Sequence, residues 1–427
     1  MTILLIQFIL LLLIFFSLLK KKPILFVLAV TFQILIYDVL SVFSDEQIPV
    51  WIRWPMKGWQ ELIFVYSGIY FLRKGLKLPT TTWIFFFLGL MGLLMGFIHG
   101  SPPEQIIQGF RLYLILPFSL FLLLESGIFN KLPIFHAAIL LIGFCCLSVV
   151  YSLWLDTQFK GELCFLWFYD FVDKIHPIEA ARFNYIRNEG LRATGFFISP
   201  LIQSAILGFA SLISLSFVLE KKGALVTRLP YLLIAILLVV GLYLCRTRIG
   251  WIILSGGFIQ WLSLQFFNRN RFYNPFYLPA FFVILTFTWL LSGFSSDPSA
   301  NGRLDQYAFC FENFKFLGYG FGHVFTITLF DSLIISSALL FGIFSIFYLM
   351  IPIGVCYFIS QIPLNRTNYK NYMDTNFLYK PIFGFSFFIL YMMAFQFTTG
   401  GPTIQLFYWF SFLILNDNHK KIEKKIR

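Results

Sequence analysis

Hydrophobic and polar positions alternate along the chain in long blocks rather than residue by residue. Apolar runs recur from one end to the other, separated by short polar stretches that carry Lys, Arg, Asn or Pro. A run of about 20 apolar residues is the length that an α-helix needs to cross a bilayer. The pattern therefore predicts an all-α polytopic membrane protein.

By this criterion, residues 1–427 form a single integral membrane domain with about 12–13 transmembrane helices. Met1–Leu19 has no basic residue at its start and is followed by three lysines, which favours a first transmembrane helix over a cleavable signal peptide. The helices are expected to begin near Thr2, Ile24, Gln60, Thr82, Glu104, Pro133, Ile198, Leu229, Ile249, Tyr277, Asp331, Pro381 and Thr403.

Composition supports the same class, since 59% of the residues are hydrophobic and only 12% are charged. The net charge of +12 would suggest nucleic acid as a partner of a soluble protein. In a membrane protein, however, an excess of basic residues marks the cytoplasmic side. We therefore expect membrane lipid, and no nucleic acid, as a partner.

The basic residues also predict an orientation. If the basic tail over residues 416–427 is cytoplasmic, 13 helices place the N-terminus outside, and most of the 32 lysines and arginines then lie inside, as the positive-inside rule requires. The two longest connections, residues 156–197 and 294–330, then lie outside. Their mixture of aromatic and charged residues predicts structured loops with short helices at the membrane surface.

The second of these loops contains a helical pattern. Apolar residues recur at helical spacing within Asn301–Phe316, which predicts a helix with one apolar face. The residues on that face are Leu304, Tyr307, Ala308, Phe311 and Phe314.

Several outward arginines run against the positive-inside trend. They are Arg111, Arg192, Arg246, Arg248 and Arg303. Arginine is costly near hydrocarbon and usually faces protein or a water-filled cavity. These side chains could reach lipid phosphates or pair with acids such as Glu189 and Asp305. Alternatively, their planar guanidinium groups could bind a diphosphate.

Neither a metal nor a cofactor is indicated. The five histidines are scattered, and the chain has no His-x-x-x-His pair, no Asp-x-Asp pair and no Gly-x-x-x-x-Gly-Lys phosphate loop. Without a metal, cationic side chains would have to stabilise a leaving pyrophosphate.

Four patches, in this order, resemble the O-antigen polymerase and ligase superfamily of bacterial envelope glycan assembly. Arg192–Pro200 is similar to the family's Arg-x-x-Gly-Phe-x-x-Pro motif, which precedes a transmembrane helix. Thr247–Gly250 is similar to its Ser/Thr-Arg turn between two helices. Gly302-Arg303 with Gly318–Gly322 resembles its Gly-Arg helix and Gly-x-Gly turn, and Asp331–Phe344 resembles the start of its next transmembrane helix.

Two differences favour the polymerase branch of that superfamily. Ligases usually carry His-Asn where this chain has Asp331-Ser332, and the Pro200 patch lacks the asparagine that often flanks it. The resemblance therefore implies an O-antigen polymerase first and a ligase, which attaches the polymer to lipid A core, second.

The resemblance implies a metal-independent glycosyltransferase at the outer face of the bacterial inner membrane. It would transfer glycan from undecaprenyl pyrophosphate onto a sugar hydroxyl of a lipid-linked repeat unit, with a chain-length regulator protein as an expected partner. Arg192, Arg248 and Arg303 would bind the pyrophosphate. Charge and location add Arg246 and Arg111 to that group.

Two residues are candidates for the general base. Asp331 would be partly desolvated at the membrane boundary, which raises the pKa of a carboxyl group, although it could instead be the N-cap of a helix. His323 is the second candidate because imidazole titrates near neutral pH, or it is only an interfacial loop residue. Aromatic residues near Trp154, Trp167 and Tyr169 are candidates for stacking on sugars.

A transporter or flippase for lipid-linked glycans would bind the same pyrophosphate lipid. Transporters often have inverted repeats and matching polar residues near mid-membrane, whereas this chain concentrates its unusual charges at one face. That distribution favours an enzyme. A membrane-embedded assembly protein is a further alternative.

Overall fold

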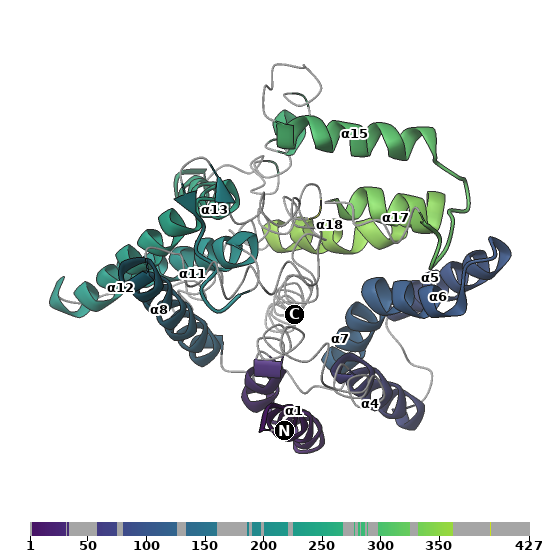
Figure 1. Ribbon diagram of the computed structural model, residues 1–427, viewed down its shortest axis with the longest axis horizontal. Coiled ribbons are helices and arrows are strands. Elements are labelled where there is room, and N and C mark those ends of the chain that lie inside the picture. The colour runs from purple at the N-terminus through teal and green to yellow at the C-terminus, as the bar shows by residue number, and fades with distance from the viewer. Residues whose placement is uncertain are drawn as a thin grey trace. The chain divides into compact units, whose positions relative to one another are not determined.

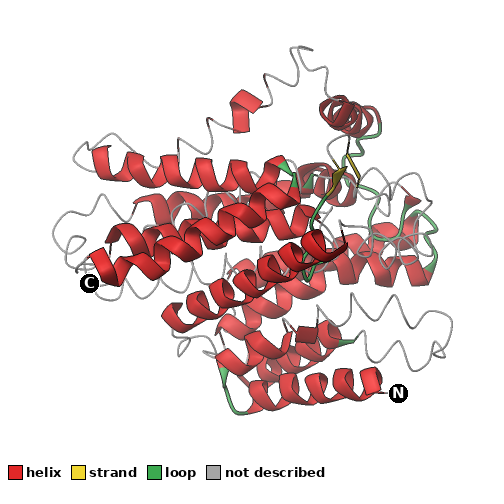
Figure 2. Ribbon diagram, turned by 60° about the vertical axis from the view of Figure 1, so that its left-hand side comes forward, coloured by secondary structure: helices red, strands yellow, loops and turns green. Residues whose placement is uncertain are grey.

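The computed structural model describes residues 2–30, 32–33, 58–74, 80–125, 134–159, 186–187, 190–197, 200–220, 225–267, 277, 281, 283–286, 288, 298–324, 332–361 and 393. These residues are almost entirely helical, apart from one pair of short strands drawn in yellow in Figure 2. Five helices among them are long and apolar enough to cross a membrane by length and composition. The chain is thus an all-α membrane protein.

These five helices begin close to predicted starts, so those positions are confirmed as long apolar helices. They are Thr80–Ile98, Pro103–Leu123, Pro200–Leu219, Arg228–Cys245 and Leu333–Gly354. Shorter apolar helices cover Leu5–Leu19 and Ala138–Trp154. The helices predicted near Tyr277, Pro381 and Thr403 lie largely outside the described residues.

The chain divides into two compact units. Unit 1 contains residues 1–59, 131–262 and 370–385, and unit 2 contains residues 60–130, 263–369 and 386–427. The elements of unit 1 are α1 (Thr2–Leu19), α8 (Ile134–Phe159), β1 (Ile186–Arg187), β2 (Gly190–Leu191), α11 (Pro200–Glu220), α12 (Leu225–Cys245) and α13 (Arg248–Phe267). Those of unit 2 are α4 (Trp59–Lys74), α5 (Thr80–Ile98), α6 (Pro103–Phe110), η1 (Arg111–Ile115), α7 (Leu116–Glu125), α15 (Pro298–Glu312), α17 (Leu333–Phe341), η3 (Gly342–Phe344) and α18 (Ser345–Gln361).

In unit 1, α11 is the central helix. Most of its side chains are buried, and it packs along α12 and α8 (Figure 1). Two of its serines donate their hydroxyl groups to carbonyl oxygens, Ser214 Oγ to Tyr231 O at 3.0 Å and Ser216 Oγ to Ile213 O at 2.6 Å, which satisfies these polar groups inside the protein. Pro200 begins this helix, at a position where the missing N–H would have no helical acceptor.

In unit 2, α5 packs along α17 and α18. Two edge-to-face ring contacts join them, Phe85 to Tyr348 and Phe87 to Phe344, with centroids 5.7 and 5.4 Å apart. Gly342 has a φ of +56° and, with the 3-10 turn η3, separates α17 from α18. On the other side of this helix pair, α15 lies along α17 (Figure 1).

A π-helical turn, η1, interrupts the transmembrane helix that α6 and α7 form. Pro117 follows in the same helix and has no N–H, so the carbonyl of Tyr113 lacks the donor that an α-helix provides four residues along. The buried hydroxyl of Tyr348 donates to this carbonyl oxygen at 2.9 Å. A side chain of α18 thus replaces the missing donor.

Parts of both predicted outer loops are described. In residues 156–197, β1 and β2 pair as antiparallel strands, where short helices were expected. In residues 294–330, α15 confirms the expected helix, although it ends at Glu312. On the predicted apolar face, Phe311 and Phe314 are 82% and 45% exposed. Neighbouring segments decide the buried face, because Tyr307, Phe309 and Cys310 pack against Tyr319, Ile335 and Leu339.

Candidate functional site

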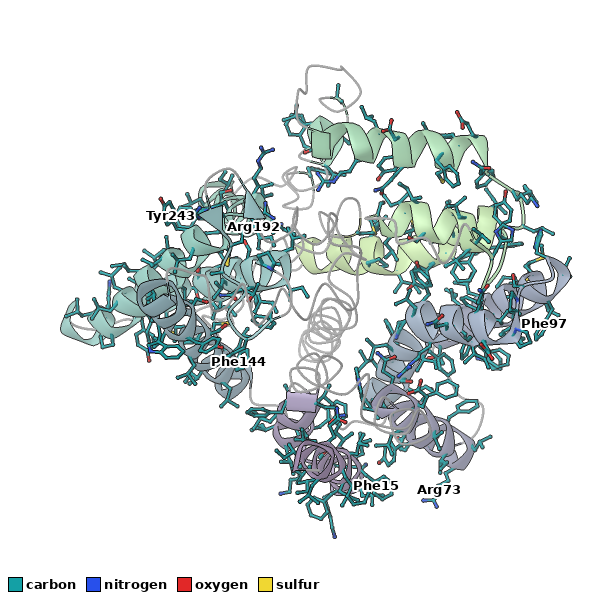
Figure 3. All side chains as sticks on the ribbon, viewed as in Figure 1. Phe15, Arg73, Phe97, Phe144, Arg192 and Tyr243 are labelled. Atoms are coloured by element: carbon teal, nitrogen blue, oxygen red, sulfur yellow. The ribbon has the colours of Figure 1, made fainter. Side chains whose placement is uncertain are left out.

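Arg192 follows β2 directly and lies at the C-terminal end of α12. The backbone N–H of Ala193 donates to the carbonyl of Leu244 at 3.0 Å, which joins this segment to the last turn of the helix. Figure 3 labels Arg192 and Tyr243, which belongs to that last turn. The Arg192 side chain is only 6% exposed. A guanidinium group is therefore held, largely out of solvent, at the end of a predicted transmembrane helix.

The segment after Arg192 is fixed by α8 and α11. Gly195 has a φ of +54°, and a Cβ at this position would overlap Ser148 Oγ and the side-chain amide of Gln203. The next residue, Phe196, donates its backbone N–H to Ser148 Oγ at 3.0 Å. Only glycine combines this backbone conformation with so close an approach, and the Arg192 segment therefore has a defined position.

The turn between α12 and α13 brings two more arginines to the same helix end. Arg246 has a φ of +48° and donates its N–H to Tyr243 O at 3.1 Å. Thr247 is buried, and Arg248 is exposed and begins α13. The N-terminus of a helix carries partial positive charge, which attracts anions. The turn therefore combines arginine charge with the positive end of α13.

Aromatic rings in the same unit form a stack next to the Arg192 segment. Tyr151 stacks on Phe196 with centroids 5.1 Å apart, and Trp154 stacks on Tyr151 at 6.1 Å. Trp154 is 50% exposed. A ring at the exposed end of such a stack can pack against the apolar face of a sugar.

In unit 2, Arg303 lies on α15 one turn before Tyr307. The Tyr307 hydroxyl and Ser332 Oγ are 3.0 Å apart, so this part of α15 is held at the start of α17. Burial raises the pKa of Tyr307 to about 12, although the hydrogen bond with Ser332 acts in the opposite direction. Tyr307 is therefore neutral and can donate this hydrogen bond.

Asp331 lies outside the described residues. The adjacent residue, Ser332, is the N-cap of α17, and its hydroxyl accepts hydrogen bonds from the backbone N–H groups of Ile334 and Ile335. Ser332 thus has the capping role that was considered for Asp331.

The Gly-x-Gly-x-Gly segment, Gly318–Gly322, passes between α5, α6 and α17. All three glycines have φ values between +74° and +81°. The N–H of Tyr319 donates to Leu339 O at 2.8 Å, and that of Phe321 donates to Gly92 O at 2.9 Å. A Cβ on Gly320 would overlap the backbone of α5. Side chains at these positions would therefore separate the segment from the helices.

This segment places His323 in a cluster with three other side chains. The ring of His323 stacks on Tyr319 with centroids 4.3 Å apart, and His99 lies 5.8 Å from His323. Lys315 Nζ is 4.4 Å from the centre of the Tyr319 ring and 3.3 Å from His99 Nε2. Burial lowers the pKa of His323, and His99 and Lys315 lower it further.

Arg111 lies elsewhere in unit 2 and has an acidic partner. Its Nε is 2.7 Å from Glu61 Oε1, and its Nη2 donates to Glu61 Oε2 at 3.3 Å. This is a two-point ion pair between η1 and α4. Sequence reasoning expected acidic partners for such arginines but did not identify Glu61.

The structure therefore brings Arg192, Arg246 and Arg248 together in unit 1, and Arg303 to the start of α17 in unit 2. It also shows that His323 has partners that the sequence did not single out, namely His99, Lys315 and Tyr319. His99 and Lys315 are 216 residues apart, so no local pattern could have paired them. Within the described ranges, no group of three His, Cys, Asp or Glu side chains is arranged to hold a metal ion.

Neither a protein-family model, nor a curated protein, nor a solved structure matches this chain.

Proposed function

We propose that this protein is a polymerase of a bacterial surface polysaccharide, of the O-antigen type. It would transfer glycan from undecaprenyl pyrophosphate onto a hydroxyl of a lipid-linked repeat unit. The observation that supports this most is the arginine group of unit 1, in which the segment of Arg192 is hydrogen-bonded to the last turn of α12, directly before the turn that carries Arg246 and Arg248.

The chemistry of the reaction explains why this group matters. The bond between the sugar C1 and the donor pyrophosphate breaks, a new bond forms from C1 to the acceptor oxygen, and undecaprenyl pyrophosphate leaves. Negative charge develops on the leaving group, and preorganised cations lower the energy of that transition state. Guanidinium groups at the N-terminus of α13 suit this purpose because they bind phosphate oxygens in pairs.

The remaining roles follow from the proposed reaction. Arg303 would bind pyrophosphate, and Asp331 would accept the proton of the acceptor hydroxyl, with His323 as the alternative base. Arg111 could contribute only if its ion pair with Glu61 opened. We further propose 12–13 helices in the bacterial inner membrane, with the N-terminus outside and the C-terminus cytoplasmic if there are 13.

The proposal is tested by replacing arginines and examining the length distribution of the surface glycan on a gel. We expect Arg192→Ala, Arg248→Ala and Arg303→Ala to lose long chains. Arg246→Gly is the sharpest variant, since glycine adopts positive φ at little cost and should preserve the turn while removing the charge. Arg228→Ala, at the opposite end of α12, is the matched control.

Membrane levels of each variant are measured alongside the gel. An unaltered glycan ladder in Arg192→Ala and Arg246→Gly cells with normal protein levels would refute the assignment of the arginine group.

Deletion of the protein separates the related alternatives. Loss of a polymerase leaves single repeat units on the lipid core, loss of a ligase leaves none and accumulates lipid-linked polymer, and loss of a flippase leaves the repeat unit on the cytoplasmic side. We expect the first result.

A further inference from the structure

The cluster of His99, Lys315, Tyr319 and His323 in unit 2 is a second concentration of cationic and hydrogen-bonding groups. Its members come from the end of α5, from the turn after α15 and from the Gly318–Gly322 segment with the residue that follows it. Three of the four were not recognised as candidates from the sequence.

The orientation of His99 follows from its two hydrogen-bond partners. Its Nδ1 is 2.8 Å from the carbonyl oxygen of Met95, which can only accept, so Nδ1 carries the hydrogen. In the neutral ring, Nε2 is then an acceptor, and the Lys315 ammonium group donates to it. Tyr319, below the ammonium group, adds a cation–π contact. Lys315 is thus held in place by His99 and Tyr319, and among the described residues no carboxylate forms an ion pair with it.

Two neighbouring side chains affect the protonation of His323. His99 and Lys315 both disfavour its protonated form. Glu104 on α6 and Glu312 on α15 are acidic, and neither forms an ion pair with Lys315 in the part of the chain that the structure describes. Lys315 therefore places an ammonium charge beside His99 in this cluster, and an anion bound there would be stabilised by that charge.

The position of the cluster at the end of a membrane-length helix favours phosphate as the anion. His99 follows the last residue of the membrane-length helix Thr80–Ile98, so the cluster lies at a helix end, where lipid phosphates and lipid-linked diphosphates are found. Lys315 and His323 are exposed and half-buried, respectively, so a ligand can reach both. The ammonium group of lysine is a common phosphate ligand.

We propose that His99, Lys315 and His323 bind a phosphate group at the membrane boundary, with Tyr319 holding Lys315 in position. If the protein is a polymerase, it must bind two lipid-linked diphosphates, and this cluster would provide a site for one of them. That use rests on the proposed function. Phosphate binding itself does not.

The test observes the imidazole NMR signals of the purified protein, labelled with ¹⁵N at its histidines and dissolved in a non-ionic detergent. His99→Gln and His323→Gln assign two of the five signals. Inorganic pyrophosphate is titrated in one series. In another, nanodiscs of phosphatidylglycerol are compared with nanodiscs of phosphatidylcholine.

We expect the His99 and His323 signals to move together and saturably, and His323 to become protonated at higher pH, because a bound anion favours the charged ring. Lys315→Met should weaken the apparent affinity about tenfold, Lys315→Arg should retain most of it, and Lys22→Met, an exposed lysine after α1, should have no effect. A response to pyrophosphate identifies a diphosphate ligand, and a response to phosphatidylglycerol alone identifies a lipid headgroup.

The proposal is overturned if neither probe moves these signals, or if Lys315→Met responds as the unmodified protein does. The result is independent of the glycan gel. If the titration changes no signal, the assignment of the unit 1 arginines is unaffected. If the glycan ladder of the arginine variants is unaltered, the proposed phosphate site is unaffected.

Discussion

Gly195 and Arg246 in unit 1 both have positive φ, for different reasons. At Gly195, the conformation and the absence of a Cβ allow the backbone to approach Ser148 and Gln203. At Arg246, the same left-handed region is occupied by a residue with a Cβ, which costs about 1–2 kcal/mol relative to glycine. A strained arginine next to Arg192 and Arg248 is consistent with a role for its charge.

Gly195 gives a prediction about stability. We expect Gly195→Ala to lower the free energy of unfolding by about 1–3 kcal/mol, because alanine is strained at this φ and its Cβ would displace two side chains. Gly143→Ala in α8 is the control, since nothing lies within 4 Å of its added Cβ and alanine favours a helix. Thermal unfolding in detergent measures both. Equal losses in the two variants would contradict the prediction.

His323 gives a prediction about pH. Its pKa in the folded protein is lowered from the ordinary value of 6.5, first by burial and then by His99 and Lys315. The unfolded chain therefore binds more protons, so the stability from this residue is complete above the ordinary pKa and is lost as the pH falls through the folded value. Between about pH 7 and 5, the unfolding temperature should fall less in His323→Gln than in the unmodified protein. Parallel curves would disprove this.

At the scale of elements, the irregular turns within the transmembrane helices contact residues of other segments. Pro117 removes a donor that Tyr348 replaces, and the break at Gly342 lies against the backbone of the turn after α15. The bounds of α6, α7, α17 and α18 could be approximated from apolar runs. The interruptions at η1 and Gly342 could not be predicted, because the residues that contact them are remote in sequence.

The contact between α18 and η1 can be tested with two substitutions. Tyr348→Phe should cost about 1–3 kcal/mol, because the buried carbonyl of Tyr113 loses its side-chain donor. Pro117→Ala restores an N–H four residues from that carbonyl, so Tyr348→Phe should cost less in this background. Tyr243→Phe, an exposed tyrosine of α12, serves as the control. An undiminished loss in the double variant would exclude this account of the proline.

At the scale of the whole molecule, charge asymmetry predicts how the protein lies in the membrane. With 13 helices, a cysteine replacing Thr2 should react with an impermeant maleimide in spheroplasts, and one replacing Lys425 should react only after lysis. The protein with its native cysteines gives the background. Protection at both ends would instead indicate 12 helices with both termini inside.

The sequence alone determined the class of protein and the position of its main helices, since runs of about 20 apolar residues satisfy their backbone only as helices across a bilayer. It also indicated Arg192, Arg246 and Arg248 as candidate functional residues, because burying arginine near hydrocarbon costs free energy. Tertiary structure decided which groups meet: Arg192 with the end of α12, Arg111 with Glu61, and Lys315 with His99. These contacts join segments that are remote in the chain, so local sequence patterns could not predict them.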